Sequence, residues 1–224
     1  MKRIFLIVFF ILLIDQILKI YIKTHFELGS GVSIFPFFWI FFVENPGMIY
    51  GIHFGNGYCG KILLSVFRFF LVFFIFFFLY KNVKKGSSYY FTIPISLILS
   101  GAIGNFLDSA LYGLLFDTGT VYNNEYCKWI PYNGISKINY FFYNFLKNKN
   151  LVNLGGYASF MGGCVVDLFY FPIIDTYIPH WIPIFGGQHF KFFKPVFNLS
   201  DIVIFAGFSL LLLFKNKIKN VKIL

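Results

Sequence analysis

The fold is decided by residues 4–22, IFLIVFFILLIDQILKIYI, an almost uninterrupted apolar run with one acid, Asp15, and one base, Lys19. A helix needs about 20 mostly apolar residues to cross the hydrocarbon core of a bilayer. Three further stretches meet this criterion, at residues 62–80, 90–116 and 196–214. The sequence therefore predicts an all-α membrane protein with four transmembrane helices, in which residues 1–224 form a single integral membrane domain.

The composition excludes a soluble globule. Of the 224 residues, 58% are hydrophobic and only 12% are charged, and the mean hydropathy is +0.73. Soluble domains carry about 25% charged residues, and half that density cannot cover a globule of this size with solvated side chains. The same apolar content excludes intrinsic disorder.

The formal net charge of +10 reflects the orientation of the helices. Lys and Arg gather on the cytoplasmic side of transmembrane helices. Three basic clusters flank the predicted spans, at Lys2 and Arg3, at Lys81, Lys84 and Lys85, and at Lys215, Lys217, Lys219 and Lys222. They fall on one side if both termini lie inside, so we expect an N-in, C-in chain and no nucleic-acid partner. The outer side then holds residues 23–61 and an extended loop, residues 117–195.

The outer segments lack the residue spacing of a metal site. All three cysteines, Cys59, Cys127 and Cys164, lie there, and their number allows one disulfide and one remaining thiol. The four histidines are scattered along the chain. We expect neither a metal ion nor a cofactor.

Polar groups inside the spans mark the candidate site, because a charged side chain within a membrane normally faces a protein interior or a cavity. Asp15 lies in the outer half of the first span, Asn105 and Asp108 near the outer end of the third, and Asn198 and Asp201 in the first turns of the fourth. With a rise of about 1.5 Å per residue, these groups reach a common depth just below the outer surface. The orientation argument used only Lys and Arg, so this convergence is independent of it.

Each of these groups also has a purely structural interpretation. Asp15 and Lys19, four residues apart on one helix face, are compatible with a simple ion pair. Asn198 and Asp201 have the spacing of a helix N-cap followed by an acid in the first turn. The polar residues of the third span are compatible with hydrogen bonds between helices. Together, however, these interpretations require independent placements at one depth.

The residue types favour hydrolysis by paired carboxylates. The sequence contains no Gly-x-Ser-x-Gly turn and no His-Glu-x-x-His motif. Two Asp side chains about 3 Å apart share one proton, so one acts as a base on water while the other, protonated, polarises the scissile carbonyl. This chemistry needs no metal and no covalent intermediate.

Five motifs follow one another along the chain: Asp15-Gln-Ile-Leu-Lys19, Glu44-Asn-Pro-Gly-Met-Ile-Tyr-Gly51, Gly101-Ala-Ile-Gly-Asn-Phe-Leu-Asp108, Gly163-Cys-Val-Val-Asp167 and Phe197-Asn-Leu-Ser-Asp201. Together they closely resemble the lipoprotein signal peptidases, also called signal peptidase II. The resemblance runs from the first span to the fourth. Each motif alone is weak, whereas five in this order on four spans are specific.

The resemblance implies an aspartyl endopeptidase of the bacterial inner membrane, with its active site at the periplasmic face and inhibited by the cyclic peptide globomycin. Such enzymes cut the signal peptide from a prolipoprotein just before its diacylglyceryl-modified Cys. The implied partners are therefore diacylglyceryl-modified prolipoproteins and membrane lipid, and we expect a monomer. The segment from Leu28 to Cys59 would correspond to an outer β-cradle and a surface helix that close over the substrate.

Carried over by motif, the catalytic pair is Asp167 and Asp201. The residues that would orient the substrate backbone or the catalytic carboxylates are Asn45, Asn105, Asp108 and Asn198, and those that would support the site are Asp15, Lys19 and Gly47. Asp117 also fits the usual short spacing after the third motif and competes with Asp167. We favour Asp167 because Val-Val-Asp followed by Leu-Phe-Tyr-Phe-Pro is closer to the family pattern.

The chain departs from this pattern at Ser109, where the family usually has an Arg directly after the Asp of the third motif. An electrostatic support is therefore missing or replaced. Arg68, early in the second span, has a side chain long enough to extend to the outer membrane interface. We expect it there, with contact to a lipid headgroup or to substrate as the weaker alternative.

Two other functions are alternatives to the protease. A small proton-coupled transporter or channel would carry acids through the full membrane depth, whereas the second to fourth spans have none toward the inner side. A non-catalytic membrane scaffold would use the carboxylates only as contacts between helices. In that case Asp201→Asn would leave function intact.

Overall fold

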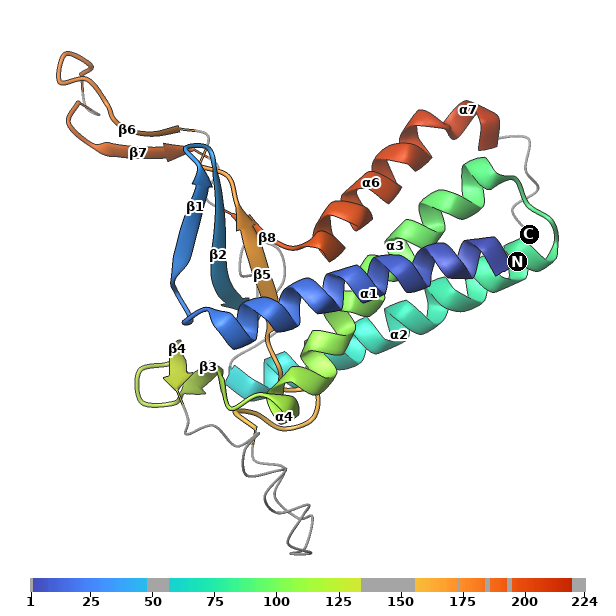
Figure 1. Ribbon diagram of the computed structural model, residues 1–224, viewed down its shortest axis with the longest axis horizontal. Coiled ribbons are helices and arrows are strands. Elements are labelled where there is room, and N and C mark those ends of the chain that lie inside the picture. The colour runs from blue at the N-terminus through green and yellow to red at the C-terminus, as the bar shows by residue number, and fades with distance from the viewer. Residues whose placement is uncertain are drawn as a thin grey trace, which may run out of the picture.

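Three long apolar helices form the body of the molecule. The structure is a computed structural model that describes residues 2–47, 57–133, 156–172, 174–183, 186–192 and 195–218. Helices α1 (Lys2–His25), α2 (Gly57–Lys84) and α3 (Tyr89–Leu107) lie side by side (Figure 1). α3 continues through a π-helical turn, η2 (Asp108–Tyr112), into the short helix α4 (Gly113–Leu115). These three helical segments are long and apolar enough to cross a membrane, as predicted for the first three spans.

The fourth apolar helix is shorter than predicted. Helix α6 (Leu199–Leu213) has 15 residues and is followed by α7 (Lys215–Ile218). At 1.5 Å per residue α6 is about 22 Å long, less than the ~30 Å of the hydrocarbon core. The predicted start at residue 196 is wrong, because Val196 and Phe197 form strand β8 and the Asn198 side chain caps the helix that follows.

The prediction of an all-α protein is wrong as well, because the outer segments form a sheet and two hairpins. The antiparallel sheet has the order β1–β2–β5–β8, built from β1 (Gly31–Phe35), β2 (Phe38–Asn45), β5 (Val165–Tyr170) and β8 (Val196–Phe197). The hairpins pair β3 (Thr118–Asn123) with β4 (Lys128–Asn133), and β6 (Ile174–Tyr177) with β7 (His189–Phe192). Short runs rich in aromatic and β-branched residues favour such strands, and a search for long apolar runs overlooks them.

Strands β1 and β2 lie in the segment for which the outer β-cradle is expected. The sheet stands at one end of the helix bundle, and the β6–β7 hairpin extends away from it (Figure 1). Within the same segment, in which a surface helix is also expected, residues 48–56 lie outside the described residues.

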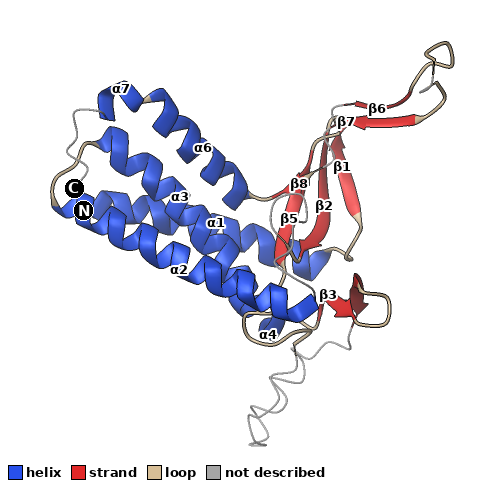
Figure 2. Cartoon of the chain, turned by 180° about the vertical axis from the view of Figure 1, so that it is seen from behind, coloured by secondary structure: helices blue, strands red, loops and turns tan. Residues whose placement is uncertain are grey.

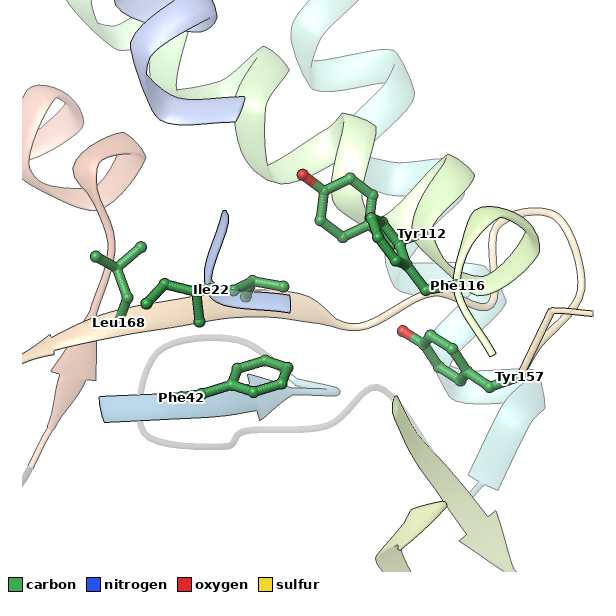
Figure 3. Packing of buried hydrophobic residues seen from close by; sticks show 7 residues of the cluster. Ile22, Phe42, Tyr112, Phe116, Tyr157 and Leu168 are labelled. Carbon is green, nitrogen blue, oxygen red and sulfur yellow. The ribbon is translucent and has the colours of Figure 1, made fainter. Parts of the chain in front are cut away.

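Two clusters of buried apolar side chains hold the helices and the sheet together. One joins the end of α1 and the π-helical turn to β2 and β5 (Figure 3); its members are Ile22, Phe42, Tyr112, Phe116, Tyr157, Val166 and Leu168. The other joins the opposite halves of α1, α2 and α3 around Ile4, Val8, Leu79 and Leu99. The first cluster fixes the sheet against the helix ends that carry the candidate polar residues.

Helices α3 and α6 approach each other closely because α3 has a glycine, Gly104, at the point where it meets α6. A Cβ atom on Gly104 would collide with the Ser200 side chain, and small residues permit such contacts between membrane helices. The close approach brings the start of α6, with Asn198 and Asp201, against the turn of α3 that carries Asn105.

The basic clusters share one end of the bundle. The start of α1, the connection between α2 and α3, and the end of α6 all lie toward the end remote from the sheet (Figure 1, Figure 2). These regions carry Lys2 and Arg3, Lys84 and Lys85, and Lys215 and Lys217. The candidate polar residues lie toward the other end, next to the sheet.

Candidate active site

Lys19 is the centre of a buried polar cluster between α1 and the third span. Its Nζ atom lies 2.9 Å from Asp15 Oδ2 and 2.8 Å from Asp108 Oδ2, and it donates a 3.1 Å hydrogen bond to Asn105 Oδ1. All three charged residues are at most 1% exposed. The ion pair between Asp15 and Lys19 is therefore present, but as part of a larger group that includes both predicted polar residues of the third span.

Asp15 also fixes the start of α6. Its Oδ1 atom accepts a 2.9 Å hydrogen bond from the Ser200 backbone N–H, one of the groups that a helix leaves unpaired in its first turn. The neighbouring Gln16 donates to Asp108 Oδ1 and accepts from the Tyr112 hydroxyl, both at 3.1 Å. One turn of α1 thereby holds the third span and α6 in place.

Asn198 caps α6 and contacts both predicted catalytic aspartates. Its Oδ1 atom accepts from the Asp201 backbone N–H at 3.0 Å, and Asp201 Oδ2 accepts from the Asn198 backbone N–H at 3.2 Å. This reciprocal arrangement is a capping box, so the N-cap interpretation is confirmed. The same Asn198 side chain donates through Nδ2 to Asp167 Oδ1 at 2.7 Å and so joins α6 to strand β5.

Asp167 and Asp201 thus lie on either side of one fully buried residue. Asp167 is 4% exposed, and Asn105 Nδ2 donates a 2.9 Å hydrogen bond to Asp201 Oδ1. Burial raises the pKa of Asp167 well above its ordinary value, and the negative charge of Asp201 raises it further. Two neighbouring carboxylates, one of which keeps its proton to unusually high pH, provide the acid and the base that aspartate-catalysed hydrolysis requires.

The π-helical turn η2 directs Asp108 toward the sheet. Asp108 Oδ2 accepts a 3.3 Å hydrogen bond from the backbone N–H of Val166, the residue before Asp167. The incoming chain packs so tightly here that a Cβ atom on Gly163 would lie 2.5 Å from the Asp108 carbonyl oxygen. π-helical turns inside helices are frequent at functional sites. Here the turn lets Asp108 reach β5 while Asn105, three residues earlier, reaches α6.

Asn45 and Gly47 lie at the end of β2 that is nearest this group. Asn45 pairs across the sheet with Val165, two residues before Asp167 on β5. Its Oδ1 atom accepts a 3.0 Å hydrogen bond from the Gly47 backbone N–H. A local turn therefore ends β2 two residues beyond Val43, the residue opposite Asp167.

Arg68 of α2 also belongs to this region. Its guanidinium donates to Ser109 Oγ at 2.6 Å and to the Gly47 carbonyl oxygen at 3.0 Å. These protein contacts were not foreseen from the sequence, and the position of Arg68 relative to the membrane interface stays a prediction. Its side chain turns inward because acceptors from two other elements lie within its reach.

Asp117, the competitor of Asp167, lies at a different place. It falls between α4 and β3 and is 8% exposed, and the carbonyl oxygen of the next residue, Thr118, accepts a 3.1 Å hydrogen bond from Lys23. Asp167 is hydrogen-bonded to Asn198, which also contacts Asp201, whereas Asp117 lies at the start of the β3–β4 hairpin.

A second buried ion pair escaped the sequence analysis. Lys23 Nζ pairs with Glu44 Oε1, and Glu44 Oε2 accepts a 2.6 Å hydrogen bond from the Thr120 backbone N–H. The ammonium group lies 4.9–5.9 Å from the ring centres of Phe42, Tyr112, Phe116 and Tyr157. Burial raises the pKa of Glu44, although Lys23 opposes the shift. The available signal was the position of Lys23, one turn after Lys19 on the same helix face.

The three cysteines are free thiols, so the disulfide that their number allows is not formed. Cys164 is fully buried, its N–H donates a 2.7 Å hydrogen bond to the Tyr157 hydroxyl, and burial raises its pKa to about 12. Within the described residues, no group of three His, Cys, Asp or Glu side chains could hold a metal ion.

A family model described as signal peptidase (SPase) II matches residues 7–216. The chain belongs to the signal peptidase II family. A lipoprotein signal peptidase of Porphyromonas gingivalis is 37% identical over 203 residues, which are 90% of this chain and 77% of that protein. A lipoprotein signal peptidase of Amoebophilus asiaticus is 30% identical over 206 residues, 90% of this chain and 72% of that protein.

Solved structures support the fold of this signal peptidase II family member. Two bacterial membrane enzymes determined by the in meso method have TM-scores of 0.54 and 0.52 at 19% and 20% sequence identity. They cover 99% and 95% of this chain, and 92% of each of those chains is matched. The protein is thus a membrane protein and a protease of the lipoprotein signal peptidase type, a family that cleaves signal peptides from prolipoproteins. These relatives give no support to a transporter or a scaffold.

Proposed function

We propose that this protein is an aspartyl endopeptidase that cuts prolipoproteins just before the diacylglyceryl-modified Cys. The observation that carries the proposal is the position of Asn198. Its side chain donates to Asp167 and its backbone N–H donates to Asp201. One buried residue thus holds two carboxylates of different elements together, and it supplies the orienting amide that an aspartate pair needs.

The surroundings favour Asp201 as the base. Its carboxylate accepts hydrogen bonds from Asn105 and Asn198 and lies in the first turn of α6, where the helix dipole favours a negative charge. Asp201 takes a proton from the attacking water, and a positioned base of this kind contributes directly to the rate.

Asp167 is the acid of the pair. Burial on β5 and the charge of Asp201 raise its pKa, so Asp167 is the carboxyl group that keeps its proton. The protonated carboxyl group donates a hydrogen bond to the scissile carbonyl oxygen as water attacks the carbon atom.

The remaining residues position this pair and the substrate. Lys19 holds Asp15 and Asp108 in one cluster, and these support the start of α6 and the strand that carries Asp167. Asn45 and Gly47, folded back at the end of β2, orient the substrate backbone.

The proposed membrane arrangement has four spans, both termini inside, and the site at the periplasmic face of the inner membrane. We expect a single integral membrane domain that acts as a monomer. The basic clusters support the orientation, since they gather at the end of the bundle remote from the sheet (Figure 1). A lipid-modified Cys presents its scissile bond at the outer interface, where water is available while the acyl chains stay in the bilayer.

Cleavage of a diacylglyceryl-modified prolipoprotein by the full-length protein in detergent tests the proposal. We expect Asp167→Asn and Asp201→Asn each to abolish cleavage while the protein still inserts into the membrane, because Asn keeps the shape and an acceptor but cannot exchange a proton. Glu125→Gln, which removes an exposed carboxylate, is the matched control and should retain full activity. Full activity in either Asn variant refutes the aspartate pair, and loss of activity with a chelator would indicate a metal-dependent hydrolase.

A further inference from the structure

Arg68 connects two separate parts of the site. Among the described residues it has two acceptors. Ser109 lies in the π-helical turn directly after Asp108, and Gly47 lies just after β2, where its N–H donates to the side chain of Asn45, the last residue of the strand. A charged side chain within a membrane helix normally faces a protein interior. Here the guanidinium ties the end of the sheet to the third span.

Ser109 connects Arg68 to Asn105, which in turn contacts Asp201. Its hydroxyl donates a 3.0 Å hydrogen bond to the carbonyl oxygen of Asn105, and the Asn105 side chain donates at 2.9 Å to Asp201 Oδ1. A chain of hydrogen bonds therefore runs from Arg68 through two residues of the third span to the proposed base.

The guanidinium also acts on the acids through its charge. The carboxylates on which it acts are Asp108, Asp201 and Asp167. In the part of the chain that the structure describes, no carboxylate oxygen forms a direct ion pair with Arg68, so its charge acts on the group as a whole. Lys19 is in direct contact with two acids of this group, and Arg68 supplies a second positive charge.

We propose that Arg68 is a positioning residue of the endopeptidase, which ties the turn after β2 to the π-helical turn and places a second positive charge beside the aspartate pair. The inference rests on the proposed function of Asp167 and Asp201. Arg68 acts through the protein groups that it contacts, the Ser109 hydroxyl and the Gly47 carbonyl oxygen. The small side chain of Ser109 suits this role, since a larger one would occupy the place of the guanidinium.

Arg68→Gln in the full-length protein, with a diacylglyceryl-modified prolipoprotein as substrate, tests the contacts and the charge together. We expect kcat to fall about 100-fold, the scale of a 1 Å misplacement in an active site, while KM stays nearly unchanged. The acid limb of the kcat profile should move up by about one pH unit, because the aspartates keep their protons to higher pH without the cation. The other charged groups that face the pair, Asp15, Lys19 and Asp108, are unchanged in this variant.

Two further variants separate contact from charge. Arg68→Lys keeps the positive charge but not the planar fork, so it should restore the acid limb and only part of kcat. Ser109→Ala removes one acceptor and keeps the charge, so it should lower kcat without a shift of the acid limb. The matched control is Lys81→Gln, which removes an exposed positive charge from the same helix and should change neither quantity.

Wild-type kcat and an unshifted profile in Arg68→Gln would overturn the inference, as would a rise in KM alone. A fall in kcat without a shift of the acid limb would reduce Arg68 to a structural contact. If Arg68→Gln does not fold, wild-type kcat in Ser109→Ala overturns the positioning role. Asp201→Asn in the same assay separates the two proposals: if it is inactive while Arg68→Gln is fully active, only the inference fails, and if it is active, the proposed function fails.

Discussion

Two buried lysines on α1, one helical turn apart, serve clusters of different kinds. Lys19 contacts the carboxylates of Asp15 and Asp108 and the amide of Asn105. Lys23 pairs with the single carboxylate of Glu44 inside four aromatic rings. Both lysine side chains are 0% exposed. The same residue type on one helix face is thus used in two ways.

The two clusters differ in their balance of charge. Around Lys23 one cation meets one anion, and the ammonium group lies among the rings of Phe42, Tyr112, Phe116 and Tyr157. Around Lys19, which contacts Asp15 and Asp108, the amides of Asn105 and Asn198 extend the cluster to Asp201 and Asp167, so acids outnumber cations. A cluster with more buried acids than cations can hold and exchange a proton, and ionisable groups with shifted pKa values are typical of functional sites. A balanced, buried pair holds structure.

The sheet keeps the two carboxylates of its central strands apart. Val43 lies opposite Asp167 and Glu44 lies opposite Val166 in the pairing of β2 with β5. Successive side chains of a strand point to opposite faces, so Glu44 and Asp167 project from opposite faces although their residues are neighbours in the sheet. One face bears the proposed site, and the other packs into the apolar cluster of Figure 3.

The largest effect on stability is expected for Lys23→Met. It leaves Glu44 buried without its cation, and breaking a buried ion pair in this way typically lowers the free energy of unfolding by about 3–5 kcal/mol. Thermal unfolding of the purified protein in detergent measures the loss.

The double variant Lys23→Met/Glu44→Gln is the control for this prediction. It removes both charges and keeps an acceptor for the Thr120 N–H, so it should recover at least half of the lost stability. If the double variant unfolds as readily as the single one, the contacts of the ammonium with the rings, and not the ion pair, stabilise this region.

Lys19→Met is expected to affect activity more than stability. Asp15 and Asp108 lose their cation, but Asp15 keeps the Ser200 N–H as a donor and Asp108 keeps Gln16 and the Val166 N–H. The free energy of unfolding should fall by about 1–3 kcal/mol, the usual cost of an unsatisfied buried group, and cleavage should fall about 100-fold through misplacement of the aspartates. Equal losses of stability in Lys19→Met and Lys23→Met, with equal activity, would contradict the division into a functional and a structural cluster.

The sequence predicted the elements that depend on composition alone. The first three spans follow from apolar runs, and each lies within a helix of the structure. Composition did not predict the strands, because runs of five to eight residues, such as β1 and β2, are too short for their burial to show in it; only the family resemblance implied an outer β-cradle in the segment that holds β1 and β2. The start of α6 was placed three residues early, because Val196 and Phe197 are apolar whether they lie in a strand or a helix.

The sequence predicted those site residues whose position follows from their depth in the membrane. Asp15, Asn105, Asp108, Asn198 and Asp201 were placed at one level by helix rise, and hydrogen bonds and ion pairs connect them. Asp167 lies on a strand, so depth could not place it and only the motif resemblance named it. The partner of Lys23 lies in a segment whose path the sequence does not specify, and the inward turn of Arg68 depends on acceptors from two other elements.

Asp167→Asn should stabilise the protein at neutral pH. The folded-state pKa of Asp167 is raised above the unfolded value of about 3.9. Below that value both states hold the proton, and as the pH rises toward the folded pKa only the unfolded state ionises, so stability falls. The Asn variant lacks this penalty and should therefore be the more stable of the two at neutral pH. Unfolding measured at pH values from 4 to 7 should show a difference that vanishes at the acidic end; a less stable variant at neutral pH would contradict it.

The smallest effect is expected for Asp117→Asn. Asp117 lies beside Thr118, whose carbonyl oxygen belongs to the Lys23 cluster, so any change should appear as a loss of stability below ~1 kcal/mol and not in cleavage or its pH profile. Comparison with Asp167→Asn in one cleavage assay makes the test sharp, because each variant removes one carboxyl group and keeps the side-chain shape. Loss of cleavage in Asp117→Asn with an active Asp167→Asn would reverse the assignment of the pair. It would also move the acid of the reaction from strand β5 to the start of the β3–β4 hairpin.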